Sequence, residues 1–259
     1  MKSVFDLRST MVAGALGLAT VLAAAAPASA ADVRDPYEET NREIFQFNLG
    51  LDRGLIRPVA RGYRTVAPEP FRDGLSNALE NLTEPQTLFN NILQGDAEAS
   101  WNTFIRFMIN TTVGLGGLFD ITTAGNFERR KEDFGQTLAV WGSDSGPYVM
   151  LPLFGPSNVR DTAGKVVDIF TDPFGMVFGF VPAISRTGAG IVDNRSETIE
   201  ASESLEATSI DLYASIRTLH FQNREYQIRN GAPAPLDDLY RDLELHKDVA
   251  VRFPRAQSN

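Results

Sequence analysis

The sequence predicts an all-α protein, and two observations lead to this class. Hydrophobic residues recur at three- and four-residue intervals along most of the chain, whereas the alternating apolar and polar runs of a half-exposed sheet are scarce. The 259 residues also include 21 glycines and 14 prolines, so we expect helices that are broken and interrupted. No Ser/Gly linker divides the chain, which indicates a single domain.

The first 30 residues have the pattern of an export signal. Lys2 and Arg8 give a charged start, an apolar run follows over 11–26, and the small residues Ala-Ser-Ala come next. Small residues at this place are typical of a signal-peptidase site. We therefore expect cleavage between Ala30 and Ala31, with a retained membrane anchor as the alternative interpretation.

Three helices are predicted in the first part of the exported chain, which we expect to form one helical domain over 31–231. Asp35-Pro36 opens the first helix, whose apolar face continues until Pro58 interrupts the pattern. Two shorter helices follow over 71–82 and 85–93, each with a narrow apolar stripe. Gly95 is expected to cap the second of them in the left-handed conformation.

The most apolar predicted helix runs over 97–113, with Asp96 as its N-cap. Its hydrophobic residues point to more than one face, which favours either the centre of a core or partial contact with lipid. It is about seventeen residues long and contains Arg106, so it does not qualify as a transmembrane span.

Two helices and one irregular stretch are predicted next. Asp133 is expected to cap a short helix that ends at Trp141. The stretch GPYVMLPLFGPSNVRD, residues 146–161, contains three prolines and cannot form an uninterrupted helix. A helix over 158–170 follows, with Ser157 as its expected cap.

The last part of the chain predicts a bent hairpin of helices and a long amphipathic helix. Glycines and a proline interrupt the apolar residues over 175–192, so we expect the backbone to bend there. The long C-terminal helix is predicted over 196–229, because apolar residues recur at three-, four- and seven-residue intervals. Asn230-Gly231 ends it, and 232–259 has the composition of a polar tail.

Composition excludes several classes of function. The formal net charge of −9 disfavours a nucleic-acid partner, because that affinity comes largely from Lys and Arg. No cysteine is present, which removes disulfides, thiolate metal sites and cysteine nucleophiles. His220 and His246 lack a second ligand at metal-binding spacing, and no phosphate loop, nucleophile elbow or calcium loop occurs. The sequence therefore predicts no catalytic residue, no metal and no cofactor.

A series of short motifs occurs in the order found in one known family. These are DPYEETNR at 35–42, RPVA at 57–60, GLSN with NLTEP over 74–85, LQGD at 93–96, RFMINT at 106–111, GLGGLFD at 114–120 and FGQTL at 134–138. The stretch at 146–161 adds Gly146, Pro147, Tyr148, Leu151, Pro152, Gly155, Pro156, Arg160 and Asp161. Together they resemble the MlaA (VacJ) family of outer-membrane lipid-asymmetry proteins.

The resemblance implies a non-enzymatic, ring-shaped helical protein in the inner leaflet of the outer membrane, often beside porin trimers. Such a protein removes mislocalised phospholipids from the outer leaflet and passes them to a soluble periplasmic carrier. Family members usually carry a lipidated cysteine at the mature N-terminus, whereas this sequence has none. We therefore expect no covalent lipid anchor, and attachment through apolar surface or a partner.

A passive mechanism would need a polar path for the head group, because unpaired charge is costly in hydrocarbon. We expect a polar opening inside the ring and lipid-facing residues outside it, namely Trp101, Phe104, Phe107, Met108, Met176, Phe178 and Phe180. The stretch 146–161 would be a stiff wall or hinge. We expect a structural ion pair or network at Arg160 and Asp161, with direct contact to a lipid head group as the alternative.

Two other functions remain as alternatives. One is a periplasmic scaffold that binds a protein partner through the amphipathic C-terminal helix without lipid transfer. The other is a lipid hydrolase, for which the sequence contains no nucleophile with a credible base.

Overall fold

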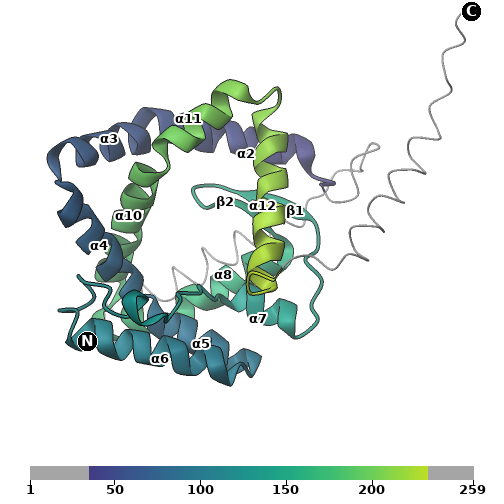
Figure 1. Cartoon of the computed structure of the whole chain (residues 1–259). Helices are drawn as coiled ribbons and strands as arrows, with labels where there is room; N and C mark the ends of the chain where they lie inside the picture. The colour runs from purple at the N-terminus through teal and green to yellow at the C-terminus, as the bar shows by residue number, and fades with distance from the viewer. Residues whose placement is uncertain (1–34, 233–259) are drawn as a thin grey trace, which may run out of the picture.

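The computed structural model describes residues 35–232, and almost all of its regular structure is helical (Figure 1). The first elements are α2 (Glu38–Leu51), the π-helical η1 (Asp52–Ile56), α3 (Arg57–Val66), α4 (Glu69–Asn81), α5 (Glu84–Gln94), α6 (Ala97–Thr112), the short η2 (Thr123–Gly125) and α7 (Phe134–Val140). They are followed by β1 (Tyr148–Leu151), β2 (Gly155–Asn158), α8 (Val159–Thr171), α9 (Pro173–Phe178), α10 (Phe180–Glu197), α11 (Ile199–Thr208) and α12 (Leu212–Ile228). The predicted signal segment with Ala30 and Ala31, and the predicted tail beyond 232, lie outside these residues.

The helices are arranged in a ring, as Figure 1 shows. α10 packs along α3 and α4, α5 packs along α6, and α7 packs along α8. α12 contacts α7 and β2, and so completes the ring on the side opposite α4 and α10. The all-α class and the ring shape expected from the resemblance are therefore confirmed, with a two-stranded hairpin as the sheet component.

The first predicted helix continues beyond Pro58, contrary to the prediction. The five-residue π-helix Asp52–Ile56 widens the turn before the proline, and Pro58 then lies in the first turn of α3. A proline is tolerated at that position because its missing N–H has no required partner there.

The stretch 146–161 forms an antiparallel hairpin, which the sequence did not predict. Two asparagines of α2, seven residues apart, bond to the main chain of β1 and the turn. The Asn41 side chain donates to Tyr148 O at 3.2 Å and accepts from Met150 N at 2.8 Å. Asn48 likewise donates to Leu151 O at 2.9 Å and accepts from Leu153 N at 2.8 Å. These hydrogen bonds satisfy main-chain N–H and C=O groups that an edge strand would otherwise leave unpaired.

The expected cap of the following helix was assigned to the wrong residue. Asn158, not Ser157, caps α8, because the Asn158 side chain accepts from Asp161 N at 2.8 Å. Ser157 instead belongs to β2, where it lies opposite Val149.

The long C-terminal helix was also predicted incorrectly, because α11 and α12 are separate helices. Asp211 caps the start of α12, because its side chain accepts a hydrogen bond from Ala214 N at 3.1 Å. The same side chain forms an ion pair with Arg42 of α2 at 2.6 Å. Leu219 and Tyr226, two of the apolar residues that recur along the predicted helix, are exposed. The pairing of Asp211 with a residue 169 positions away is a tertiary contact that sequence periodicity does not contain.

Several local predictions are confirmed. Gly95 ends α5 with a φ of 77°, and Asp96 caps α6 by accepting from Ala99 N at 2.9 Å. Asp133 caps α7 by accepting from Gln136 N at 2.9 Å. The bend predicted within 175–192 occurs at Gly179, where the α8–α9 segment and α10 meet at 114°.

Candidate functional site

The buried residues of the described chain are mostly polar, which reverses the usual distribution of residues. Among the described residues, eight hydrophobic residues are buried against 22 polar or charged ones. A small apolar cluster, built on Phe45, Tyr148, Met150 and Tyr213, joins α2, β1 and α12. Water-soluble domains bury mostly hydrophobic side chains, so this protein is not organised around an ordinary apolar core.

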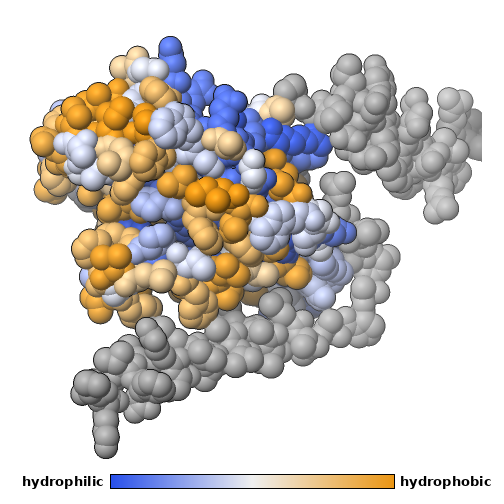
Figure 2. Space-filling model, turned by 90° about the horizontal axis from the view of Figure 1, so that it is seen from below, coloured by the Kyte–Doolittle hydropathy of each residue, from blue (hydrophilic) through white to orange (hydrophobic). Residues whose placement is uncertain are grey.

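Many large hydrophobic side chains are exposed. Six of the seven residues expected to face lipid are exposed: Trp101 63%, Phe104 40%, Met108 42%, Met176 74%, Phe178 61% and Phe180 50%. Phe107 is half-buried, and α6 packs along α5. Hydrophobic residues cover much of the face seen in Figure 2, whereas hydrophilic residues gather along one side.

Other exposed hydrophobic residues were missed by the sequence analysis. They follow α6 in the Gly-rich loop or lie near the end of α8: Val113, Leu115, Leu118, Phe119, Ile169 and Phe170. Their apolar character was visible in the sequence, but nothing in the local pattern distinguishes an exposed apolar residue from a buried one.

No single helix among the described residues is long and apolar enough to cross a membrane. The segment Val159–Phe178 and α10 together meet the length and composition criteria, but the 114° bend separates them.

A charged network is buried between α5, α6 and the loop that follows α6. Arg106 is 1% exposed, and its guanidinium lies 3.3 Å from the Glu84 carboxylate and 2.9 Å from that of Asp120. Arg129 approaches Glu84 to 3.0 Å. Burial raises the pKa of Glu84 to about 7, and the charge of Arg106 opposes this shift. The arginine was identified only as a polar exception on an apolar helix.

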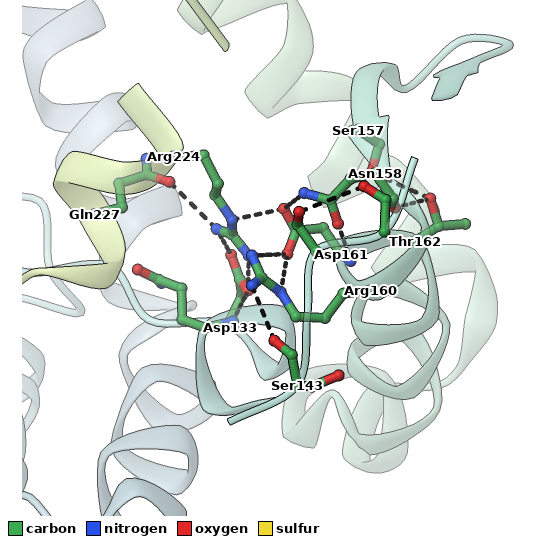
Figure 3. Close-up of polar contacts among 12 residues, drawn as sticks. Asp133, Ser143, Ser157, Asn158, Arg160, Asp161, Thr162, Arg224 and Gln227 are labelled. Carbon is green, nitrogen blue, oxygen red and sulfur yellow. Dashed lines mark hydrogen bonds and ion pairs between the residues drawn. The ribbon is translucent and has the colours of Figure 1, made fainter. Parts of the chain in front are cut away.

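A second charged network closes the ring where α12 meets α7 and α8 (Figure 3). Arg224 of α12 donates to Asp161 at 2.7 and 2.9 Å and to Asp133 at 2.6 and 2.7 Å. Arg160 donates to Asp161 at 3.1 Å, which is the ion pair expected there. Burial opposes ionisation of Asp161, but the hydrogen bonds of Arg224 outweigh it and hold its pKa below the ordinary value.

The other motif residues of the stretch 146–161 lie in or beside the hairpin. Gly146 and Gly155 both have positive φ, and Tyr148 and Leu151 are buried in β1. Pro147 and Pro152 flank β1, and Pro156 lies opposite Met150 in β2. The stretch 146–161 therefore contributes to both the hairpin and the Arg224 network. Its last two residues, Arg160 and Asp161, lie in the first turn of α8 and belong to that network.

Two adjoining hollows line the inner face of α10. The first has a volume of about 380 Å³ and lies between α4, α5, residues 131–133 and α10. The second, of about 410 Å³, lies between η1 and α10. Both are lined by Thr187, Gly190 and Asn194, so the same small polar face of α10 borders each of them.

The first hollow, which we call the α4–α10 cavity, carries charges of both signs. Its cations are paired, because Lys131 lies 2.8 Å from Glu80 and Arg186 lies 2.8 Å from Asp172. Acidic residues outnumber them on the cavity wall, and include Asp193 and Glu197 of α10. Over residues 35–232, no group of three or more acidic or histidine side chains has the arrangement of a metal site.

Comparison with known proteins gives consistent matches over most of the chain. The sequence model of the family described as MlaA lipoprotein matches residues 33–227. The intermembrane phospholipid transport system lipoprotein MlaA of Escherichia coli K12 is 34% identical over 231 residues, covering 86% of this chain and 91% of the relative. Its counterpart of the same name in Haemophilus influenzae is 32% identical over 201 residues, covering 76% of this chain and 80% of the relative.

A solved structure matches the fold as well. It was determined in work on the structural basis for maintenance of bacterial outer membrane lipid asymmetry. The two chains superpose with a TM-score of 0.68 at 33% identity, over 75% of this chain and 98% of the other.

Proposed function

The chain belongs to the MlaA lipoprotein family, and we propose that it takes part in phospholipid transport that maintains the lipid asymmetry of the outer membrane. In this proposal it lies in the inner leaflet, removes mislocalised phospholipids from the outer leaflet through the polar interior of the ring, and delivers them to a soluble periplasmic carrier. Porin trimers are proposed neighbours, as the family resemblance implies.

The observation that carries the proposal is the inverted distribution of polarity. Exposed hydrophobic surface is unfavourable in water by about 25 cal/mol per Å². Met176 and Val177 are each 74% exposed, and further exposed apolar residues surround them at the α9–α10 corner. A hydrocarbon environment removes this cost, and it leaves the polar interior as the favourable place for a head group.

Passive transfer follows from this segregation. A phospholipid head group would move along the polar inner face, where Thr187 and Asn194 of α10 can replace its water hydrogen bonds. The acyl chains need no polar partner and would stay in contact with lipid. No nucleotide or metal is required, because the lipid moves down its own gradient.

Attachment without a lipidated cysteine is proposed to rest on two apolar surfaces. One is the α9–α10 corner around Gly179, and the other is the exposed side of α6 with Trp101 and Met108. Charged groups are absent from the six residues of α9 and from the first turn of α10, so this corner carries no local charge to desolvate.

The proposal is tested by reconstituting the full chain into vesicles and purifying it again in mild detergent. We expect phospholipid to co-purify and to be quantifiable by mass spectrometry, and we expect the protein to accelerate loss of a labelled phospholipid to an acceptor. Absence of both bound phospholipid and accelerated transfer would refute the proposal.

Membrane fractionation separates this function from the scaffold alternative. A protein held by apolar insertion stays in the membrane fraction at high salt and is released by detergent, because salt screens only charge interactions. A scaffold held by polar contacts would be released by high salt alone.

A further inference from the structure

The α4–α10 cavity contains buried carboxylates that have no cationic partner. Asp193 is 5% exposed and Glu132 is 8% exposed, and both line the cavity. Asp193 accepts one hydrogen bond, from the Tyr63 hydroxyl at 3.2 Å, and Glu132 accepts one from Gln94 at 2.9 Å. Neither forms an ion pair with any residue in 35–232.

This arrangement differs from that of the other buried carboxylates. Glu84, Asp161 and Asp172 are each buried and each lies within 3.3 Å of an arginine nitrogen. A buried carboxylate without a cation is costly, and the cost disappears when a cationic ligand binds. Burial, the largest influence, raises the pKa of Glu132, as expected for a carboxyl that lacks a cationic partner.

The residues that line the α4–α10 cavity favour one class of cationic ligand over others. No aromatic residue is among the described residues that line the cavity, whereas quaternary ammonium groups are typically held by aromatic faces. A primary ammonium has three N–H donors, which match carboxylate, amide and hydroxyl acceptors such as those of Asp193, Asn194 and Thr187. A metal ion is a poor match, since no three-carboxylate arrangement is present among the described residues.

The same wall can also accommodate a phosphate. Lys131 and Arg186 both border the cavity, so an anionic group could approach them while an ammonium group approaches the carboxylates. The volume of about 380 Å³ lies within the range of ordinary small-molecule sites.

We propose that the α4–α10 cavity is a recognition site for a zwitterionic phospholipid head group with a primary ammonium, as in phosphatidylethanolamine, with Asp193 and Glu132 holding the ammonium. This inference rests on the proposed function, because it assigns a substrate class to the polar interior. It predicts discrimination against head groups that carry a net negative charge or lack N–H donors.

The test uses the full chain in vesicles with equal parts of phosphatidylethanolamine, phosphatidylcholine and phosphatidylglycerol with matched acyl chains. Lipid that co-purifies in mild detergent is quantified by mass spectrometry. We expect roughly tenfold enrichment of phosphatidylethanolamine over either competitor, which is the effect of one charge-assisted hydrogen bond. Bound lipid in the vesicle ratio would overturn this inference and leave the proposed function intact, whereas no bound lipid would refute both.

Two isosteric variants test whether Asp193 and Glu132 cause the enrichment of phosphatidylethanolamine. Asp193→Asn and Glu132→Gln should each reduce the enrichment several-fold while total bound phospholipid is retained. Glu39→Gln, which changes an exposed carboxylate on α2, is the matched control and should leave the enrichment unchanged. Enrichment that persists in both variants would overturn the assignment of these residues.

A measurement on the unchanged protein covers the case in which a variant fails to fold. Vesicles containing phosphatidylethanolamine and its mono-, di- and trimethylated forms should give enrichment that falls as N–H donors are removed. Equal retention of all four lipids would overturn the proposed recognition of a primary ammonium.

Discussion

Replacing Arg224 by methionine tests whether one buried network closes the ring. Arg224 makes four hydrogen bonds of 2.6 to 2.9 Å to Asp133 and Asp161, and it is the charged contact of α12 in Figure 3. Methionine retains much of the apolar length of the side chain but leaves two carboxylates without this partner. The free energy of unfolding should therefore decrease.

The expected size of the decrease follows from the burial of each partner. Removing one member of a buried ion pair costs about 3 to 5 kcal/mol. The Asp161 side chain is 4% exposed but retains Arg160, and the Asp133 side chain is 39% exposed and can regain water. We therefore expect a loss near the lower limit, about 3 kcal/mol, or roughly a hundredfold in the folding equilibrium constant.

Urea denaturation in detergent micelles, followed by circular dichroism, measures this loss. Arg61→Met is the matched control, because the Arg61 side chain is 58% exposed in its pair with Glu203 and should contribute about 1 kcal/mol or less. A loss below about 1 kcal/mol for Arg224→Met would refute the view that this network closes the ring. A double-mutant cycle with Asp161→Asn would then measure the coupling energy directly.

Three further predictions concern membrane attachment, pH and the hairpin. The double variant Val177→Glu with Val181→Glu should be released from membranes by high salt or mild alkali, whereas the unchanged protein should need detergent. Both side chains are more than 70% exposed at the apolar corner, where a charge would oppose insertion. Continued retention of the variant in the membrane fraction would contradict insertion at this corner. Burial lowers the pKa of His220 from 6.5 to about 4, so between these pH values the unfolded state binds more protons than the folded state. The free energy of unfolding should therefore fall by up to about 3 kcal/mol as the pH decreases from 6.5 to 4. His220→Gln should flatten this pH dependence in denaturation curves measured across that range. Pro152→Ala with Pro156→Ala should lower the free energy of unfolding by about 1 kcal/mol or more and increase outer-membrane permeability to detergent; normal protein levels with unchanged detergent sensitivity would count against a structural role of the prolines.

Local features of the fold could be predicted because their causes lie within a few residues. Asp96 and Asp133 cap their helices through amide groups three positions ahead, and Gly95 ends a helix because it tolerates positive φ. The bend near Gly179 was similarly indicated by interrupted apolar residues.

Other features depend on residues far apart in the chain. The hairpin at 146–161 is held by Asn41 and Asn48, more than 100 positions away, so the local pattern of prolines and glycines could exclude a helix but could not identify strands. The break before α12 has the same origin, because Asp211 pairs with Arg42. Periodicity treated both regions as isolated segments and therefore missed the contacts that determine them.

The sequence by itself determined the helical class, the approximate bounds of α4 to α8 and the amount of apolar and polar material, since these depend on local hydrogen bonding and composition. Only the tertiary structure decided which of those residues lie inside. Arg224 meets Asp133 and Asp161 across 91 and 63 positions, and Trp101 and Met176 remain outside. An apolar helix face has the same pattern whether it meets protein or lipid, and closure of the ring is what assigns each face to its environment.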